Sequence, residues 1–338
     1  MTLSSAPRTR SADTDAEAEQ YNETLRLLSE GSVDKHFDPY VDIDWDSREF
    51  EVTKGDRRWI LPATTDALGS HAWYQALPED RQIAIGMWRQ ANIAKVGLQF
   101  ENILIRGMMQ YVFSLPNGSP EARYCTHESI EECNHTLMFQ EMVNRIDADV
   151  PGMNRPMKLI SPIIPLFSTL LPELFFVGVL AGEEPIDHIQ KSFLRSGADI
   201  HPIMQSVMVI HVAEEARHIS FANQLLRRRV PQMSRVGRFL LSLAFPITMR
   251  ILCDVIAIPP KKFWKKFDIP KYVKDDLFWG TEQSQHRLQD YFGDVRMLAT
   301  DTGMMNRSAK LLWKACGIDG RASRYRSEPD RSSSHFAA

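Results

Sequence analysis

The sequence predicts an all-α protein built on a bundle of four long helices. After Pro78, apolar residues recur at helical spacing through long segments, which proline, glycine and asparagine interrupt. Two of these segments carry the same motif, Glu-x-x-His, and each follows a segment in which a glutamate interrupts apolar residues. With 338 residues, 43% of them hydrophobic, the chain can bury one large core. A net charge of −3 argues against a nucleic-acid-binding protein.

The N-terminal part is expected to be less regular than the bundle. Residues 1–20 are polar and acidic, which predicts a disordered tail, and residues 320–338 predict a second one. Between residues 40 and 61, apolar and polar residues alternate around a Lys-Gly-Asp turn, which predicts a small N-terminal hairpin region. We therefore expect one domain over residues 21–319, with its functional core at about residues 80–230.

The first two bundle helices have clear ends. The first is expected over residues 81–113, because a Pro-Asn-Gly sequence follows it. The second begins at Ser119, which can cap it, and has Pro120 at its first position and Glu121 in its first turn. Its helical pattern continues into the 140s.

The later helices are predicted in the same way. A third bundle helix lies within residues 166–196, and a fourth begins near Asp199, with Pro202 in its first turn, and ends before Pro231. Additional C-terminal helices are expected over three further ranges, 235–256, 272–299 and 304–315.

Two apolar runs, residues 159–181 and 239–258, raise the question of a membrane. Both contain prolines and charged residues, which are costly inside a bilayer, so we predict buried helices of a large core. The basic cluster Lys261–Lys266 follows the second run. It could contact an anionic membrane surface, but a solvated loop is the interpretation we favour.

The cysteines and the N-terminus predict a cytoplasmic protein. The four cysteines include no C-x-x-C pair, so neither a disulfide framework nor a zinc ribbon is expected. The first twenty residues contain no apolar stretch of the kind that secretory signals carry.

Both Glu-x-x-His motifs can present two ligands from one helix. Glu132 and His135, and likewise Glu215 and His218, are three residues apart and therefore share a helical face. Such pairs also arise by chance, so the argument depends on their context.

That context is a second pair of glutamates in apolar surroundings. Glu101 precedes the first motif and Glu183 precedes the second, and each lies in an otherwise apolar segment. A buried carboxylate must be neutralised, paired or bound to metal. The order Glu, Glu-x-x-His, Glu, Glu-x-x-His is that of ferritin-like di-iron carboxylate bundles. Carboxylate and imidazole donors suit two iron or manganese ions.

His211 adds a third imidazole to the same helical face. It lies four residues before Glu215 and seven before His218, among apolar neighbours. A lone histidine on an apolar face is usually a core residue. Because the two metal-ligand candidates share its face, we favour a third histidine ligand.

These residues resemble the di-iron arylamine N-oxygenases, the family that makes nitro groups in the aureothin and chloramphenicol pathways. That family carries an extra histidine in the spacing H-x-x-x-E-x-x-H on its last metal helix. The resemblance covers roughly residues 80–230. It implies seven metal ligands: Glu101, Glu132, His135, Glu183, His211, Glu215 and His218.

The resemblance also implies cofactors and partners. Two iron ions, or an iron–manganese pair, would use O2 as co-substrate and form a peroxo-di-iron species that transfers oxygen to the substrate. The leading acceptor is an amine nitrogen on an aromatic ring. Because the sequence shows no flavin or nicotinamide motif, a ferredoxin or reductase would supply electrons. A homodimer is expected.

Three residues depart from, or add to, the family pattern. Pro185 follows Glu183 by two residues, which predicts a kink or a fresh helix start next to the metals. Glu128 lies four residues before Glu132, and it is either a carboxylate supporting the ligands or a charge in a wet channel. Asp187 could bond a ligand histidine, although a surface ion pair is slightly favoured.

Two other functions compete with N-oxygenation. A di-iron desaturase or C-hydroxylase would use the apolar helices 159–181 and 239–258 to line a tunnel for a lipid or acyl chain. A usual desaturase site has two histidines, so His211 argues against it. A non-catalytic iron-binding protein is the weakest alternative, because storage proteins have shorter and more polar chains.

Overall fold

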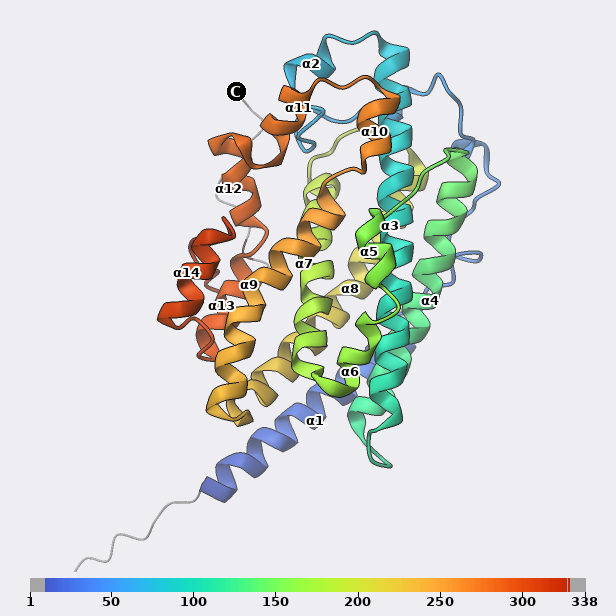
Figure 1. Ribbon diagram of the computed structural model, residues 1–338. Coiled ribbons are helices and arrows are strands. Elements are labelled where there is room, and N and C mark those ends of the chain that lie inside the picture. Colours follow the sequence, from blue (N-terminus) through green and yellow to red (C-terminus); the bar gives the residue numbers. More distant parts are fainter. Residues whose placement is uncertain (1–9, 327, 329–338) are drawn as a thin grey trace, which may run out of the picture.

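The computed structural model describes residues 10–326 and residue 328, and these residues contain helices and no strand (Figure 1). The all-α prediction is therefore confirmed. Helix α3 packs on α4 and α7 packs on α8, while α4 contacts α8 and α3 contacts α7, which closes the bundle. The four bundle helices are α3 (Glu79–Phe113), α4 (Pro120–Ile146), α7 (Pro172–Arg195) and α8 (Pro202–Arg229).

The predicted helix starts are found where the sequence places them. Ser119 caps α4 by accepting a hydrogen bond from the backbone N–H of Ala122, and Pro120 occupies the first turn. Helix α8 begins at Pro202, where the side chain of His201 accepts a hydrogen bond from the N–H of Ile203.

Helix α7 continues through Pro185 without interruption. The predicted fresh start beside Glu183 is therefore wrong, and the predicted kink stays a prediction. Pro185 is itself buried, and α7 packs on both α8 and α9. The burial of apolar surface offsets the one backbone hydrogen bond that the ring of Pro185 removes.

The N-terminal tail is helical where the structure describes it. Helix α1 spans Arg10–Asp34, so the predicted disorder is wrong for residues 10–20, and residues 1–9 lie outside the described part. Tyr21 and Leu25 are buried where α1 packs on α4 and α8. At the other end, residue 327 and residues 329–338 of the predicted second tail also lie outside the described part.

The predicted hairpin region is wrong. Residues 40–61 form turns and two short 3₁₀ helices, η1 (Arg48–Phe50) and η2 (Arg57–Trp59). Their apolar residues pack directly on the bundle: Trp59 is buried and its ring stacks on His201 at 4.4 Å between centroids. The backbone bonds are correspondingly local, as from Trp59 N–H to the Asp56 carbonyl. Alternating apolar residues can thus face a core from successive turns as well as from a strand.

The C-terminal helices include one further correction. Helices α9 (Arg235–Ala257) and α14 (Arg307–Ala315) match their predicted ranges. The helix expected over 272–299 is divided, because Trp279 adopts a left-handed φ of 74° and Thr281 begins a new helix with a capping box. The resulting pieces are α11 (Lys271–Asp275), a π-helical turn (Asp276–Gly280), α12 (Glu282–Asp290) and α13 (Gly293–Asp301).

Short elements connect the longer helices. They are α2 (Ala72–Gln75), α5 (Arg155–Ile160), η3 (Ile164–Leu166), α6 (Phe167–Leu170), η4 (Val230–Gln232) and α10 (Lys261–Lys266).

The two apolar runs are less buried than the sequence suggests. By length and composition, one helical stretch among the described residues, Arg235–Lys266, could cross a membrane, and only 33% of its most apolar window is buried. Phe245 and Met249 on its inner side are fully buried, whereas Leu240 is 59% exposed. Leu159 and Leu170, in the first run, are 80% and 72% exposed. The expectation that both runs form buried helices is therefore wrong for the outer faces of these helices.

Two glycines of α7 test how tightly the bundle is packed. A Cβ atom at Gly182 would lie 1.9 Å from the ring of Phe100 on α3, so Gly182→Ala should lower the free energy of unfolding by about 1–3 kcal/mol. One turn earlier, a Cβ at Gly178 would meet only Leu252, at 3.9 Å. Gly178→Ala should therefore be neutral or stabilising by up to about 1 kcal/mol. Urea unfolding of the metal-free variants measures both values, and equal losses would contradict the close approach.

Candidate metal centre

The seven side chains predicted as metal ligands lie together in the middle of the bundle. Their ligand atoms form overlapping groups, within each of which every atom lies within 4.8 Å of the others. Each of the seven residues is at most 2% exposed. Helix α3 supplies Glu101, α4 supplies Glu132 and His135, α7 supplies Glu183, and α8 supplies His211, Glu215 and His218.

The two motif histidines turn the same nitrogen towards the carboxylates. The Nδ1 atom of His135 lies 3.1 Å from Glu132 and 3.4 Å from Glu215. The Nδ1 atom of His218 lies 2.9 Å from Glu132 and 3.2 Å from Glu215. Glu132 and Glu215 therefore each lie close to the Nδ1 atoms of both rings.

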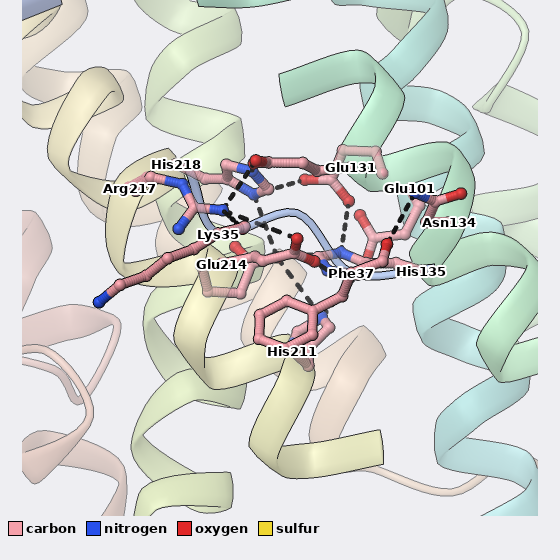
Figure 2. Close-up of polar contacts among 12 residues, drawn as sticks. Lys35, Phe37, Glu101, Glu131, Asn134, His135, His211, Glu214, Arg217 and His218 are labelled. Atoms are coloured by element: carbon pink, nitrogen blue, oxygen red, sulfur yellow. Dashed lines mark hydrogen bonds and ion pairs between the residues drawn. The ribbon is translucent and has the colours of Figure 1, made fainter. Parts of the chain in front are cut away.

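The opposite nitrogens are held by a crossed pair of carboxylates. The Nε2 atom of His135 on α4 lies 2.8 Å from Glu214 on α8, and that of His218 on α8 lies 2.7 Å from Glu131 on α4. Arg217 donates a hydrogen bond to Glu131 at 2.7 Å and lies 3.6 Å from Glu214 (Figure 2). A carboxylate on Nε2 fixes the orientation of the ring and favours the tautomer with its lone pair on Nδ1.

Sequence analysis missed Glu131, Glu214 and Arg217. The signal was present, because each motif reads Glu-Glu-x-x-His rather than Glu-x-x-His alone. The first glutamate of each pair lies about 100° around the helix from the second, which directs it to the neighbouring motif helix. Recognising its role requires knowing that the two motif helices are neighbours.

The two ring nitrogens of His211 differ in their contacts: Nδ1 contacts a residue outside the cluster, and Nε2 faces the cluster. Its Nδ1 atom lies 2.9 Å from the side-chain oxygen of Gln190 on α7. Its Nε2 atom lies 3.6 Å from Glu101 and 3.5 Å from Glu215, and it has no hydrogen-bond partner among the described residues. Among the described residues, no backbone carbonyl forms a hydrogen bond with this ring, in contrast to the usual core histidine.

Several other buried atoms of the cluster are equally unpartnered. One carboxylate oxygen of Glu101, one of Glu183 and one of Glu215 have no hydrogen-bond partner within the described part of the chain. Buried polar atoms without partners are rare, because each costs free energy comparable to a lost hydrogen bond. Cations between these oxygens would satisfy them, so the donor set fits a metal centre.

The pKa shifts of the clustered side chains also indicate that the site lacks positive charge. Burial, with the neighbouring carboxylates of Glu132 and Glu183, raises the pKa of Glu101 well above its usual range. Burial also raises the pKa of Glu183, again with help from nearby carboxylates. For His135, burial favours the neutral ring, but hydrogen bonds to Glu132 and Glu214 outweigh it and raise the pKa to about 10. The cluster thus attracts protons, and metal cations would compete for the same positions.

Comparison with known proteins decides the family. The family model described as "P-aminobenzoate N-oxygenase AurF" matches residues 18–303 of the chain. The chain belongs to the AurF family. It is also 62% identical over 323 residues to uncharacterized proteins of Mycobacterium tuberculosis and Mycobacterium bovis, which covers 96% of this chain and 94% of each relative. The suspected N-oxygenase family is confirmed, and the chain is a member of an oxygenase family.

Glu128, the residue that departs from the expected family pattern, is fully buried. Neither of its carboxylate oxygens has a hydrogen-bond partner among the described residues, and burial raises its pKa to about 8. Both interpretations of Glu128, a carboxylate that supports the ligands and a charge in a wet channel, therefore stay predictions. The charge of His218 partly offsets the effect of burial on the pKa of Glu128.

Asp187 does not bond a histidine of the cluster. Its carboxylate pairs with Lys191 at 2.6 Å, although Asp187 is only 6% exposed rather than at the surface. It lines a cavity of about 820 Å³ beside the metal centre of this AurF-family protein. Near the cluster, the cavity wall includes Phe139, whose ring lies 5.1 Å from that of His211, and Gln190. Such a cavity is large enough for a drug-sized substrate.

The crossed carboxylates should control metal affinity. Glu214→Ala removes the group that orients His135, so we expect ferrous ion to bind about 10–100-fold more weakly, as measured by competition with a chelator. Glu141→Ala is the matched control, because Glu141 forms its ion pair with Arg145, away from the cluster. Equal affinity in both variants would show that Glu214 does not support the centre.

Glu128 should make the metal-free protein less stable as pH rises. Its carboxyl ionises near 4.5 when unfolded and near 8 when folded. Relative to Glu128→Gln, the wild type should therefore lose about 1.4 kcal/mol of unfolding free energy per pH unit between these values, and no more above pH 8. Urea unfolding of both proteins from pH 5 to pH 9 measures the difference. A difference independent of pH would contradict the buried neutral carboxyl.

Proposed function

We propose that this protein is an O2-dependent non-haem di-iron oxygenase that converts an arylamine towards its hydroxylamine or nitro product. One observation carries the proposal: in a member of the AurF family, His211 joins the two Glu-x-x-His motifs and presents an unpartnered Nε2 to the cluster. The proposal gives seven ligands to two metal ions, iron or an iron–manganese pair.

The charge of the ligand set supports two divalent ions. Four carboxylates, those of Glu101, Glu132, Glu183 and Glu215, carry four negative charges, which equal the positive charges of two ferrous ions. A buried site is least costly when its net charge is zero. Glu132 and Glu215, which lie close to both motif histidines, would hold the ions together with Glu101 and Glu183.

The remaining groups of the chain position and protect this centre. When bound, the two ions activate O2 for transfer of oxygen to the substrate. Glu131 and Glu214 hold the motif histidines, and Gln190 holds His211 in place. Phe139, between the cluster and the cavity, limits the access of water to the reacting atoms. The substrate would bind in the cavity with its amine towards the side of His211.

A second candidate function is supported by the size of that cavity. At about 820 Å³ it exceeds what a single aromatic ring needs, and Ile93, Met142 and Val207 contribute apolar walls. A di-iron desaturase or C-hydroxylase acting on a lipid or acyl chain would use such a space. His211 favours N-oxygenation over this alternative, and a purely iron-binding protein would have no use for the cavity.

The proposal includes partners that act outside the centre. Because the sequence contains no flavin or nicotinamide motif, we propose an external ferredoxin or reductase as electron donor. A cytoplasmic location and a homodimer complete the proposal.

Metal analysis followed by an arylamine assay tests the function. We expect two iron ions per chain after reconstitution with ferrous salt under anaerobic conditions. With hydrogen peroxide in place of O2 and reductase, a panel of arylamines should give hydroxylamine or nitro products detectable by mass spectrometry. One zinc ion and no iron would contradict the metal centre, whereas two irons with oxidation only of acyl substrates would favour the second candidate.

His211→Ala separates the two oxygenase candidates. The variant should retain iron through the other ligands but lose arylamine oxidation, by roughly tenfold or more if the imidazole supplies an essential nitrogen donor. His127→Ala, on the outer side of α4, is the matched control and should keep full activity. Undiminished N-oxygenation by His211→Ala would remove the main support for the arylamine assignment.

A further inference from the structure

A broad apolar surface covers one side of the protein. It is formed by residues 155–171, which include α5, η3 and α6, and by the outer side of α9. These two stretches carry nearly half of the exposed large apolar side chains of the described residues: Leu159, Ile160, Ile163, Leu166, Leu170, Leu171, Val236, Phe239, Leu240, Ile247 and Ile251.

The two stretches belong to the same side of the bundle. Helices α6 and α9 both pack on α7, and both lie in front of the bundle in Figure 1. Along α9, the exposed residues Val236, Leu240, Ile247 and Ile251 recur with helical spacing and so form a stripe that faces away from the core. Scattered exposed apolar residues are normal, but a concentration of this kind marks an interaction surface. We name it the apolar face.

The charges around the apolar face are basic. Residues 155–171 contain Arg155 and Lys158 and no acidic residue, and the first turn of α9 adds Arg235 and Arg238. None of these four forms an ion pair with a carboxylate in the described part of the chain. The α10 segment Lys261–Lys266, which follows the end of α9, contains four lysines and no carboxylate.

The acidic residues of these stretches are already compensated. Within α9, Asp254 pairs with Arg250 at 3.0 Å. Four basic residues therefore border the apolar face without an ion-pair partner among the described residues. Of the four lysines of α10, Lys262 pairs with Asp149, and the other three extend the positive charge beyond the end of α9. The natural complement of this surface is apolar in the middle and negatively charged at its edge.

We propose that the apolar face docks the protein on an anionic lipid membrane. The aliphatic side chains would enter the boundary between headgroups and acyl chains, and the arginines and lysines would contact lipid phosphates. A second copy of the chain complements the face less well, because a twofold interface would bring the same basic residues of both subunits together. The inference does not rest on the proposed function.

The cavity beside the metal centre reaches the same region. Ile256 and Ala257, at the C-terminal end of α9, line it together with Trp279. Docking would therefore place one wall of the cavity close to the lipid headgroups.

Vesicle sedimentation of the full-length protein tests this proposal. The protein should sediment with phosphatidylcholine vesicles that contain phosphatidylglycerol, much less with phosphatidylcholine alone, and less at high salt. Leu170→Asp/Leu240→Asp should weaken binding by roughly tenfold or more, because it places charge in the apolar boundary. The control Leu27→Asp, at a position 55% exposed on α1, should bind as wild type does. Helix content and thermal unfolding confirm that each variant is folded.

Three results would overturn the proposal. The first is a wild type that sediments with neither kind of vesicle. Binding that Leu170→Asp/Leu240→Asp leaves unchanged would show a purely electrostatic attraction that does not use the apolar face. A dimer in light scattering that Leu240→Asp dissociates, without lipid binding by the wild type, would identify the face as a subunit interface.

Discussion

The concentration of four carboxylates and three imidazoles in a buried core is the constraint on which the rest of this structure depends. Uncompensated, such charges would cost far more free energy than a domain of this size can spare. Compensation comes in layers. The Nδ1 atoms of two histidines face Glu132 and Glu215, the carboxylates of Glu131 and Glu214 face the Nε2 atoms of those histidines, and Arg217 contacts both of these outer carboxylates. Long, continuous helices are needed because every layer must keep its place relative to the others.

The residues of the site that could be predicted are those that share one face of one helix. Glu132 and His135 share a face through their spacing, as do His211, Glu215 and His218, so the sequence alone groups them. The partnership of Glu131 with His218 could not be predicted in the same way, because it joins two helices that are far apart in the chain. The same limit applies to Gln190, whose role is visible only where α7 meets α8.

The errors in the predicted fold also have physical causes. Around Trp59, alternating apolar residues pack on the bundle through successive turns, so the pattern of a strand arises without a strand. The helix expected over 272–299 ends at Trp279 because one left-handed residue redirects the chain, which the helical pattern alone does not reveal. The part of the apolar face that lies on α9 illustrates a third cause. The hydropathy of a segment shows how apolar the segment is but not what its side chains contact.

The crossed arrangement of the two motifs has a consequence for how the protein can evolve. Glu131 belongs to the first motif helix but serves the histidine of the second, and Glu214 does the reverse. A substitution in either motif therefore disturbs the ligand geometry of both halves at once. Neither motif can change towards another metal or another geometry alone, so the two motifs, which Arg217 contacts together, should change only in concert.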